Sequence, residues 1–354
     1  MVALAGVLGC LELLLQAFGF EPPGAFTNLR YESDPMTGPQ AMPLQVGFAR
    51  SSCFTAPAIH INRFGMRDRE RKLTASHTRI ALIGDSIVEG LQVRDDETVS
   101  RRLEALLQDR ADVLNFGVSS TGTAVQFLQY AARVRPFHPE IVVVVLWVEN
   151  DAIDNVPSMK QRRDPYMARV SPYLLPDEHG GLRLQPGAAR RTPKALSLLV
   201  STAAGRWIIY ARRLATWPAA GESGQTKRSV GGGTAPESEE AAAWELTEQI
   251  IARFHAQVRS DGAHFALAVV PAGMESLGLT GHPSEATQVA VTRLQALAQR
   301  EGFPLADLSH AFQAVVEREG PTPFVYACDG HWNPRGHWIA AEAIQQFLEQ
   351  QRWL

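Results

Sequence analysis

The 354-residue sequence has few cysteines and little charge imbalance, and these absences exclude several classes of protein. The net charge of −3 does not suggest a nucleic-acid partner, and we expect none. The three cysteines, Cys10, Cys53 and Cys328, lack the short spacings of a metal site, and we expect neither a metal nor a cofactor. Cys53 and Cys328 could instead form a disulfide if the protein faces an oxidising compartment.

Only the N-terminus has an apolar run that could reach across a bilayer. "MVALAGVLGCLELLLQAFGF" (1–20) has the roughly 20 residues that a span requires. However, Glu12 would cost about 2.5–3.5 kcal/mol near the bilayer centre, and no basic residues precede the run. The segment 1–24 could be a membrane anchor, an uncleaved signal segment or an apolar helix docked on the domain. We favour the anchor, with the rest of the chain on the extracytoplasmic side.

Regular alternation of strands and helices begins near Arg79. Residues 25–60 are rich in Pro, Gly and Ser and predict a linker, which precedes a domain over 61–354. Within that domain "EIVVVVLWV" (140–148) is typical of a parallel strand covered on both faces. The alternation predicts an α/β protein with a mostly parallel sheet. The expected strands are 79–84, 112–117, 140–148, 264–272 and 303–309. The expected helices are 98–110, 123–134, 244–260, 284–302 and 335–351.

The region 155–243 interrupts this alternation and predicts a variable insertion. Its first part, to residue 217, has few clear patterns apart from an apolar stretch over 196–214. Its second part, 218–243, is rich in Gly, Ser, Pro and Glu, a composition that favours disorder.

Polar residues follow the predicted strands at the points where those strands end. Asp85-Ser86 follows the first, Asn115-Phe116-Gly117 ends the second, and Asn150-Asp151 follows the third. Asp329 and His331 lie in "CDGHWNPRGH", just before the last helix. Ligands of an open parallel sheet bind beyond the carboxyl ends of its strands. We therefore expect these residues to lie near one another.

These residue types suit an ester-cleaving serine enzyme. A serine hydroxyl needs a base to become a nucleophile, and His331 could remove the proton of Ser86. Asp329 could hold the imidazole in the right tautomer and stabilise its charged form. The oxyanion needs donors, which the N–H groups of Ser86 and Gly117 and the side-chain amide of Asn150 could supply.

Each of these residues also has an ordinary structural explanation when it is taken alone. Ser86 could be a helix N-cap, Gly117 a turn glycine and His331 a hydrogen-bonded loop histidine. The Gly-x-Ser-x-Gly elbow of other α/β hydrolases is absent, because Val88 lies two residues after Ser86. The ordered combination therefore favours a serine enzyme more than any single residue does.

The combination also resembles the SGNH (GDSL-type) hydrolase family. "GDSIVEG", "NFGVSSTGT", "WVENDAIDN" and "DGHWNPRGH" look like the four blocks of that family, in family order. "INRFGMRDRE" (61–70) is similar to a stretch upstream of the first block in many bacterial members. The family residues correspond here to Ser86, Gly117, Asn150 and His331. The fourth block has Asp-x-His spacing, which resembles SGNH-like polysaccharide O-acetyltransferases and some esterases.

The resemblance implies a flavodoxin-like three-layer α/β/α sandwich and acyl-ester chemistry. We expect a serine esterase that cleaves acyl esters, for example acetyl esters on a carbohydrate, through Ser86, His331 and Asp329. Its partner would then be a small-molecule or carbohydrate ester. Two alternatives are an O-acyltransferase that modifies a surface polysaccharide and a catalytically silent binding module of such a system.

Overall fold

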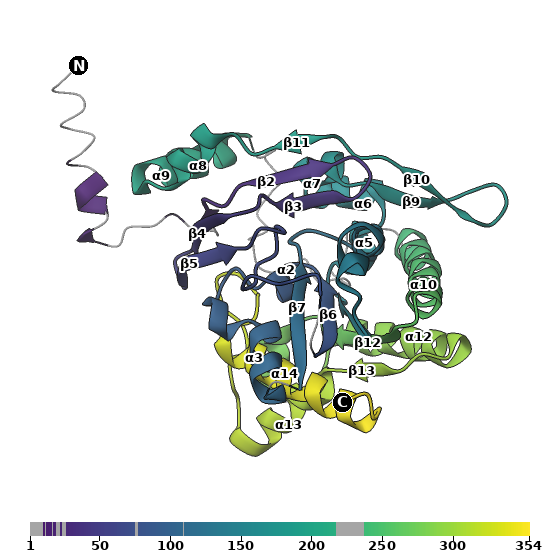
Figure 1. The fold of residues 1–354 in the computed structure, drawn as a ribbon. Coiled ribbons are helices and arrows are strands. Elements are labelled where there is room, and N and C mark those ends of the chain that lie inside the picture. The colour runs from purple at the N-terminus through teal and green to yellow at the C-terminus, as the bar shows by residue number, and fades with distance from the viewer. Residues whose placement is uncertain are drawn as a thin grey trace.

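A computed structural model of the chain describes residues 10, 12–15, 17–18, 22, 26–74, 77–108, 110–216 and 237–354. Figure 1 shows the central sheet below and a second group of strands, β1 to β5 and β9 to β11, above it. The central sheet comes from the region that the sequence predicted to alternate between strands and helices.

Five parallel strands form the central sheet, in the order β13-β12-β8-β6-β7. Read from the β7 edge, the order is β7-β6-β8-β12-β13. If the five strands are numbered by their order along the chain, this is 2-1-3-4-5, the strand order of flavodoxin-like folds. All five expected strands are confirmed, with ends that differ by at most two residues. Their bounds are β6 (Thr78–Gly84), β7 (Ala111–Gly117), β8 (Ile141–Trp147), β12 (His264–Val270) and β13 (Leu305–Asp307).

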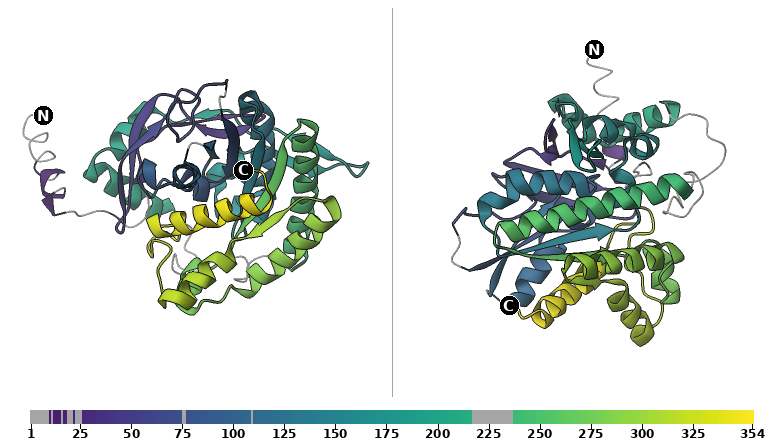
Figure 2. Two further views of the ribbon diagram at one scale, coloured as in Figure 1. Left: turned by 60° about the horizontal axis from the view of Figure 1, so that its bottom comes forward. Right: turned by 90° about the vertical axis from the view of Figure 1, so that its right-hand side faces the viewer.

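Helices cover both faces of this sheet, so the domain has three layers (Figure 2). Every residue of β8 is buried, as its continuous apolar sequence predicts for a strand between two helical layers. One layer contains α3 (Val99–Leu107), α11 (Met274–Thr280), α13 (Ser309–Glu319) and α14 (Pro334–Gln350). The other contains α4 (Thr123–Gln129), the π-helical turn η2 (Tyr130–Val134), α10 (Glu237–Ser260) and α12 (Glu285–Glu301).

Residues 25–60 are more regular than the predicted linker. Two three-stranded antiparallel sheets include them, in the orders β1-β4-β5 and β11-β2-β3. Leu29, Ala49, Phe54 and Ile59 bury a small core of their own there. The linker prediction was wrong because short antiparallel strands with turn residues have little periodicity of their own. Their bounds are β1 (Phe26–Thr27), β2 (Tyr31–Asp34), β3 (Gly38–Ala41), β4 (Gln45–Arg50) and β5 (Thr55–Ile61).

The first part of the predicted insertion is also ordered into short elements. β11 pairs with β2, which joins the insertion to the N-terminal strands. The stretch 218–243 lies mostly outside the described residues, but α10 begins at Glu237 and thus earlier than the predicted 244. The bounds are α5 (Asp151–Asp154), α6 (Pro157–Arg163), α7 (Pro165–Val170), β9 (Tyr173–Pro176), β10 (Leu182–Gln185), β11 (Arg190–Arg191), α8 (Lys194–Val200) and α9 (Ala203–Thr216).

The N-terminal segment 1–24, expected to be a membrane anchor, lies largely outside the described residues. Over the part of the chain that the structure describes, no helix combines the length and apolar character needed to cross a bilayer. Glu12 is described, and its carboxylate accepts hydrogen bonds from the N–H groups of Ala203 and Ala204 at 2.8 and 2.9 Å. This glutamate therefore contacts the beginning of α9.

Candidate active site

Ser86 is the first residue of α2 (Ser86–Glu89), which begins directly beyond the end of β6. Asp85 is the N-cap of this helix, and its Oδ1 accepts a hydrogen bond from the Ile87 N–H at 2.9 Å. The N–H of Ser86 donates to no group of the described residues. Ser86 thus lies at the carboxyl edge of the sheet with an unused N–H, as a nucleophile that is also an oxyanion donor requires.

His331 lies against this serine, although 245 residues separate the two in sequence. The distance between His331 Nε2 and Ser86 Oγ is 2.8 Å, which is within reach for proton transfer. On the other side of the ring, Nδ1 lies 3.0 Å from Asp329 Oδ2 and 3.2 Å from the carbonyl oxygen of Asp329. The contact with the carbonyl oxygen has hydrogen-bond geometry, whereas that with the carboxylate meets only the distance of an ion pair.

The charges around His331 favour its protonated form. Burial alone would lower the pKa of His331, but Asp329 outweighs burial and Asp85 acts in the same direction, so the pKa is raised. For Asp329, burial disfavours the carboxylate, but the neighbouring imidazole outweighs it and lowers the pKa of Asp329. The site thus stabilises an imidazolium–carboxylate pair, which is the state that a general base reaches after it takes a proton.

Asn150 is the N-cap residue of α5, three residues beyond the end of β8, and its side-chain amide reaches the residue before the serine. Its Nδ2 donates to Asp85 Oδ2 at 2.7 Å, while its Oδ1 is buried and accepts no hydrogen bond from the described residues. One amide hydrogen is fixed by Asp85, so the other remains for a ligand. Burial raises the pKa of Asp85, and the bond from Asn150 opposes this rise.

Gly117 does not have the role that the sequence predicted. Its N–H already donates to Asn115 Oδ1 at 2.9 Å, so it is not available to an oxyanion. A Cβ at this position would overlap the backbone N of Glu89 and lie 2.6 Å from the carbonyl carbon of Val88. The prediction of an oxyanion donor at Gly117 is therefore corrected: this glycine lets β7 approach the backbone of α2.

The turn after β7 contains another N–H that is free. Ser120 has a left-handed φ of 60°, and its N–H donates to no group of the described residues. Val118 N–H donates to the Gly84 carbonyl at 3.0 Å, so this turn lies beside the strand that leads to Ser86. The buried Lys160 from α6 donates to the Ser120 carbonyl at 2.7 Å.

The sequence analysis also missed two neighbours of the site, one aromatic and one acidic. The ring of Trp147, the last residue of β8, lies 5.6 Å from the His331 ring, measured between centroids. Glu89, the last residue of α2, is buried and accepts from the Tyr31 hydroxyl at 2.7 Å and from the Ser119 N–H at 2.8 Å. Glu89 directly follows the apolar Ile87 and Val88 in a segment expected to be buried, and an acid in that position is a pattern that could have indicated it.

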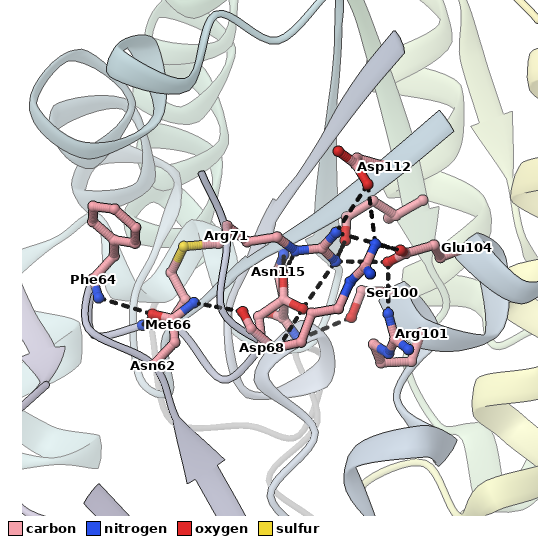
Figure 3. A network of polar contacts seen from close by, with 12 residues as sticks. Asn62, Phe64, Met66, Asp68, Arg71, Ser100, Arg101, Glu104, Asp112 and Asn115 are labelled. Atoms are coloured by element: carbon pink, nitrogen blue, oxygen red, sulfur yellow. Dashed lines mark hydrogen bonds and ion pairs between the residues drawn. The ribbon is translucent and has the colours of Figure 1, made fainter. Parts of the chain in front are cut away.

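The stretch "INRFGMRDRE" takes part in a polar network with residues of α3 and β7 (Figure 3). Asp68 Oδ2 accepts from Arg71 Nε at 2.9 Å and from the Asn115 N–H at 3.2 Å. Asn115 Nδ2 in turn donates to the Val88 carbonyl of α2 at 3.0 Å. The upstream stretch is thereby connected through β7 to the helix that begins with Ser86.

The fold and this geometry define an α/β protein with the parts of a serine hydrolase: a serine beyond a parallel strand, an imidazole on its hydroxyl and an acid on the imidazole. Residues 82–339 match the GDSL-like Lipase/Acylhydrolase family. The chain belongs to this family of ester-cleaving hydrolases, which confirms the resemblance inferred from the four blocks. Within the described residues, no group of three or more His, Cys, Asp and Glu side chains could hold a metal ion.

Several solved structures are similar to this chain, whereas no curated protein matches it. LAE5, an alpha/beta hydrolase from the metagenome of Lake Arreo, Spain, is 14% identical with a TM-score of 0.43, over 78% of this chain and 97% of that one. The acetyl xylan esterase AlAXEase is 11% identical with a TM-score of 0.44, over 76% and 98%. A catalytic mutant of the acetylxylan esterase Axe2 from Geobacillus stearothermophilus is 12% identical with a TM-score of 0.43, over 78% and 96%.

Proposed function

We propose that this hydrolase is a serine esterase that forms an acyl-enzyme on Ser86, with His331 as general base and Asp329 as the acid that stabilises it. The observation that carries the proposal is the 2.8 Å distance between Ser86 Oγ and His331 Nε2. With the Nδ1 proton directed at Asp329, Nε2 has a free lone pair and can accept the hydroxyl proton.

In the acylation step, Ser86 Oγ attacks the carbonyl carbon of the ester while its proton passes to His331 Nε2. The carbonyl oxygen becomes an oxyanion, which the Ser86 N–H and the second amide hydrogen of Asn150 stabilise. The Ser120 N–H supplies the third donor in place of Gly117. The tetrahedral intermediate then collapses: the bond to the leaving alcohol breaks, and the alcohol oxygen takes the proton from Nε2.

In the deacylation step, water repeats the same sequence on the acyl-enzyme. His331 Nε2 takes a proton from the water as its oxygen attacks the acyl carbon. The bond between the acyl carbon and Ser86 Oγ breaks, and Oγ recovers a proton from Nε2. The products are a carboxylic acid and free enzyme, so no cofactor takes part in this scheme.

For the substrate we propose an acetyl ester on a carbohydrate. The Asp329-x-His331 spacing supports this, because it resembles that of SGNH-like polysaccharide O-acetyltransferases and some esterases. The same acyl-enzyme could pass its acyl group to a sugar hydroxyl instead of water, so the experiment has to follow both outcomes.

The test is an ester panel with a covalent probe. Nitrophenyl acetate, butyrate and octanoate and an acetylated xylooligosaccharide are incubated with the protein, with and without free sugar, and released and transferred acyl groups are measured. A fluorophosphonate should label Ser86, as located by mass spectrometry, and Ser86→Ala should lose both labelling and turnover. Acetyl release exceeding octanoyl release supports the proposal. Labelling of another serine, or full turnover by Ser86→Ala, would overturn it.

We also propose that the protein works in an oxidising, extracytoplasmic compartment. The Cys53–Cys328 disulfide supports this, because disulfides rarely persist in the cytosol. The test is to alkylate thiols in intact producing cells and to determine by mass spectrometry whether Cys53 and Cys328 are blocked. Complete alkylation of both would contradict the proposal.

A further inference from the structure

We propose that residues 26–71, which precede the family-matched region, position both halves of the site: Arg67 holds the nucleophile helix α2, and the Cys53–Cys328 disulfide holds the loop that carries Asp329 and His331. This inference rests on the proposed function, since it assigns positioning residues to the same serine and histidine. In Figure 1 the labelled strands of this segment lie above the central sheet, and one of them, β2, contacts α2 through Tyr31 and Glu89.

The disulfide is attached to the loop that carries the acid Asp329 and the base His331. Cys328 is the residue before Asp329, and its partner Cys53 lies between β4 and β5, with the two Cα atoms 6.0 Å apart. Beside it, the rings of Phe54 and Tyr326 pack with centroids 5.3 Å apart. The N-terminal segment therefore contacts this loop through a covalent bond and through an aromatic pair.

The loop itself is a tight turn that depends on these anchors. The N–H groups of Asp329 and Gly330 both donate to the Tyr326 carbonyl, at 3.0 and 2.8 Å, and Tyr326 N–H donates to the His331 carbonyl at 2.9 Å. Gly330 has φ of 75°, a left-handed conformation that turns the chain between Asp329 and His331. Because Tyr326 organises the turn and packs on Phe54, movement of the 53–54 segment would displace the imidazole.

On the other side of the site, Arg67 supports α2 at its C-terminal end. Its side chain is 1% exposed. The guanidinium donates to the carbonyls of Glu89 at 2.9 Å and Val93 at 2.6 Å, and also to that of Gly90. A helix of four residues is too short to be stable by itself. A cation that binds its last carbonyls satisfies groups that have no partner inside the helix and complements its dipole.

Because the Arg67 guanidinium is buried, its contacts must compensate for the loss of its hydration. Among the described residues, Arg67 forms an ion pair with Asp95 Oδ1 at 3.3 Å, and that residue is 36% exposed. The carbonyls at the end of α2 and just beyond it therefore compensate its desolvation together with Asp95 and the buried carboxylate of Glu89. The same helix is held a second time by this segment, because the Tyr31 hydroxyl of β2 donates to Glu89. Displacements of about 1 Å in a catalytic pair can cost about 10²-fold in rate.

The test of the loop anchor uses the full chain in a Cys10→Ser background, so that no third thiol can exchange. The folded protein is treated with a water-soluble phosphine. The disulfide accepts two electrons and two protons and gives two thiols, while the phosphine is oxidised to its oxide with an oxygen from water. Reduction of protein that is already folded avoids a variant that fails to fold, and a thermal melt confirms that it stays folded at the assay temperature.

We expect kcat on nitrophenyl acetate to fall about 10- to 100-fold on reduction. The acid side of the profile of kcat/KM against pH should also move to lower pH. Asp329 of its own loop and Asp85, the N-cap residue of α2, both raise the pKa of His331. The buried His337 of α14 also interacts with His331, but its own pKa is lowered to about 3, so it stays neutral over this pH range. We expect the contribution of Asp329 to shrink when the turn loosens. A disulfide that only stabilises the fold would lower the melting temperature without moving this profile. Unchanged kcat and an unchanged profile would overturn the loop half of the inference.

The test of Arg67 compares Arg67→Met and Arg67→Lys with Arg69→Met. Arg69 is the matched control, because it lies two residues away and is 51% exposed. We expect Arg67→Met to lower kcat about tenfold or more with little change in KM. Arg67→Lys should recover part of this loss, and Arg69→Met should be unchanged. If Arg67→Met does not fold, the result for Arg67→Lys alone tests the role of Arg67. A wild-type kcat in Arg67→Lys, or in an Arg67→Met that does fold, would overturn the inference that Arg67 positions α2.

The rate of fluorophosphonate labelling at Ser86 separates the two levels of the argument. A Cys10→Ser parent that does not label at Ser86 overturns the proposed function, and this inference with it. If the parent labels at Ser86 and the reduced and Arg67-substituted forms label just as fast, the proposed function stands and only this inference is overturned. Slower labelling in both forms supports it.

Discussion

His331 Nδ1 is held by two oxygens of one residue, Asp329: the carboxylate Oδ2 at 3.0 Å and the backbone carbonyl at 3.2 Å. The Asp-x-His spacing therefore permits contact with the acid, and it adds a carbonyl acceptor that a side-chain substitution cannot remove. The carbonyl can fix the tautomer of the ring, whereas only the carboxylate can neutralise the imidazolium.

Asp329→Ala and His331→Ala should consequently differ in severity. His331→Ala should be nearly inactive, because no other base reaches Ser86 Oγ in the described structure. Asp329→Ala should lose less than the roughly 10⁴-fold expected when a triad histidine takes the wrong tautomer, because the carbonyl still accepts from Nδ1. Values of kcat on nitrophenyl acetate measure both. Equal losses would show that the carbonyl does not orient the ring, and robust activity in His331→Ala would refute the base assignment.

The pH dependence of kcat/KM should report the raised pKa of His331. The base must be neutral to accept a proton, so activity should fall as the pH drops through this pKa. Since the pKa is raised, the midpoint should lie above the ordinary value of about 6.5. Asp329→Ala removes the main cause of the rise and should move the midpoint to lower pH. A midpoint in the parent below that ordinary value would contradict this electrostatic description.

Asn150→Ala should lower kcat by about 10²–10³ if its amide is an oxyanion donor. Asp85→Asn is the companion variant, because it keeps the size of the side chain but weakens the charge-assisted bond that orients the Asn150 amide. We expect a smaller loss of kcat there. If Asn150→Ala changed only KM, the amide would bind the ground state and the transition state equally.

Gly117→Ala should reduce stability, because the added methyl group overlaps the backbone of α2 at Glu89 and Val88. Neither backbone can yield without moving the nucleophile, so we expect a loss of about 1–3 kcal/mol in the free energy of unfolding. Urea denaturation measures it. Activity should fall as well, although the N–H of residue 117 is retained. Wild-type stability would show that β7 and α2 are less closely packed than described.

Much of the central fold could be predicted from the sequence, for a local reason. Strands such as 78–84 and 141–147 are apolar along most or all of their length, and the helices between them have apolar residues at helical spacing. The candidate site could be predicted for a similar reason, because the carboxyl ends of parallel strands meet at one edge. Ser86 lies at that edge because it follows β6, whereas His331 reaches it from the loop before α14.

The N-terminal strands could not be recognised in this way. β2 and β3 contain Glu, Gln, Gly and Pro residues. The pairing of β2 with β11, between Glu32 and Arg191 159 residues apart, has no local pattern. The disulfide joins cysteines 275 residues apart, so the count of cysteines permitted the pair without establishing it.

Within the site, the sequence by itself determined which chemical groups are present, and the tertiary structure decided which of them are free to act. Gly117 was a reasonable donor on the sequence, but Asn115 occupies its N–H. Arg67 was one of several arginines in a charged stretch, and it differs from Arg69 only because the chain path buries it against the carbonyls of α2. Hydrogen-bond partners and burial depend on contacts between distant segments, and no local pattern of residues encodes them.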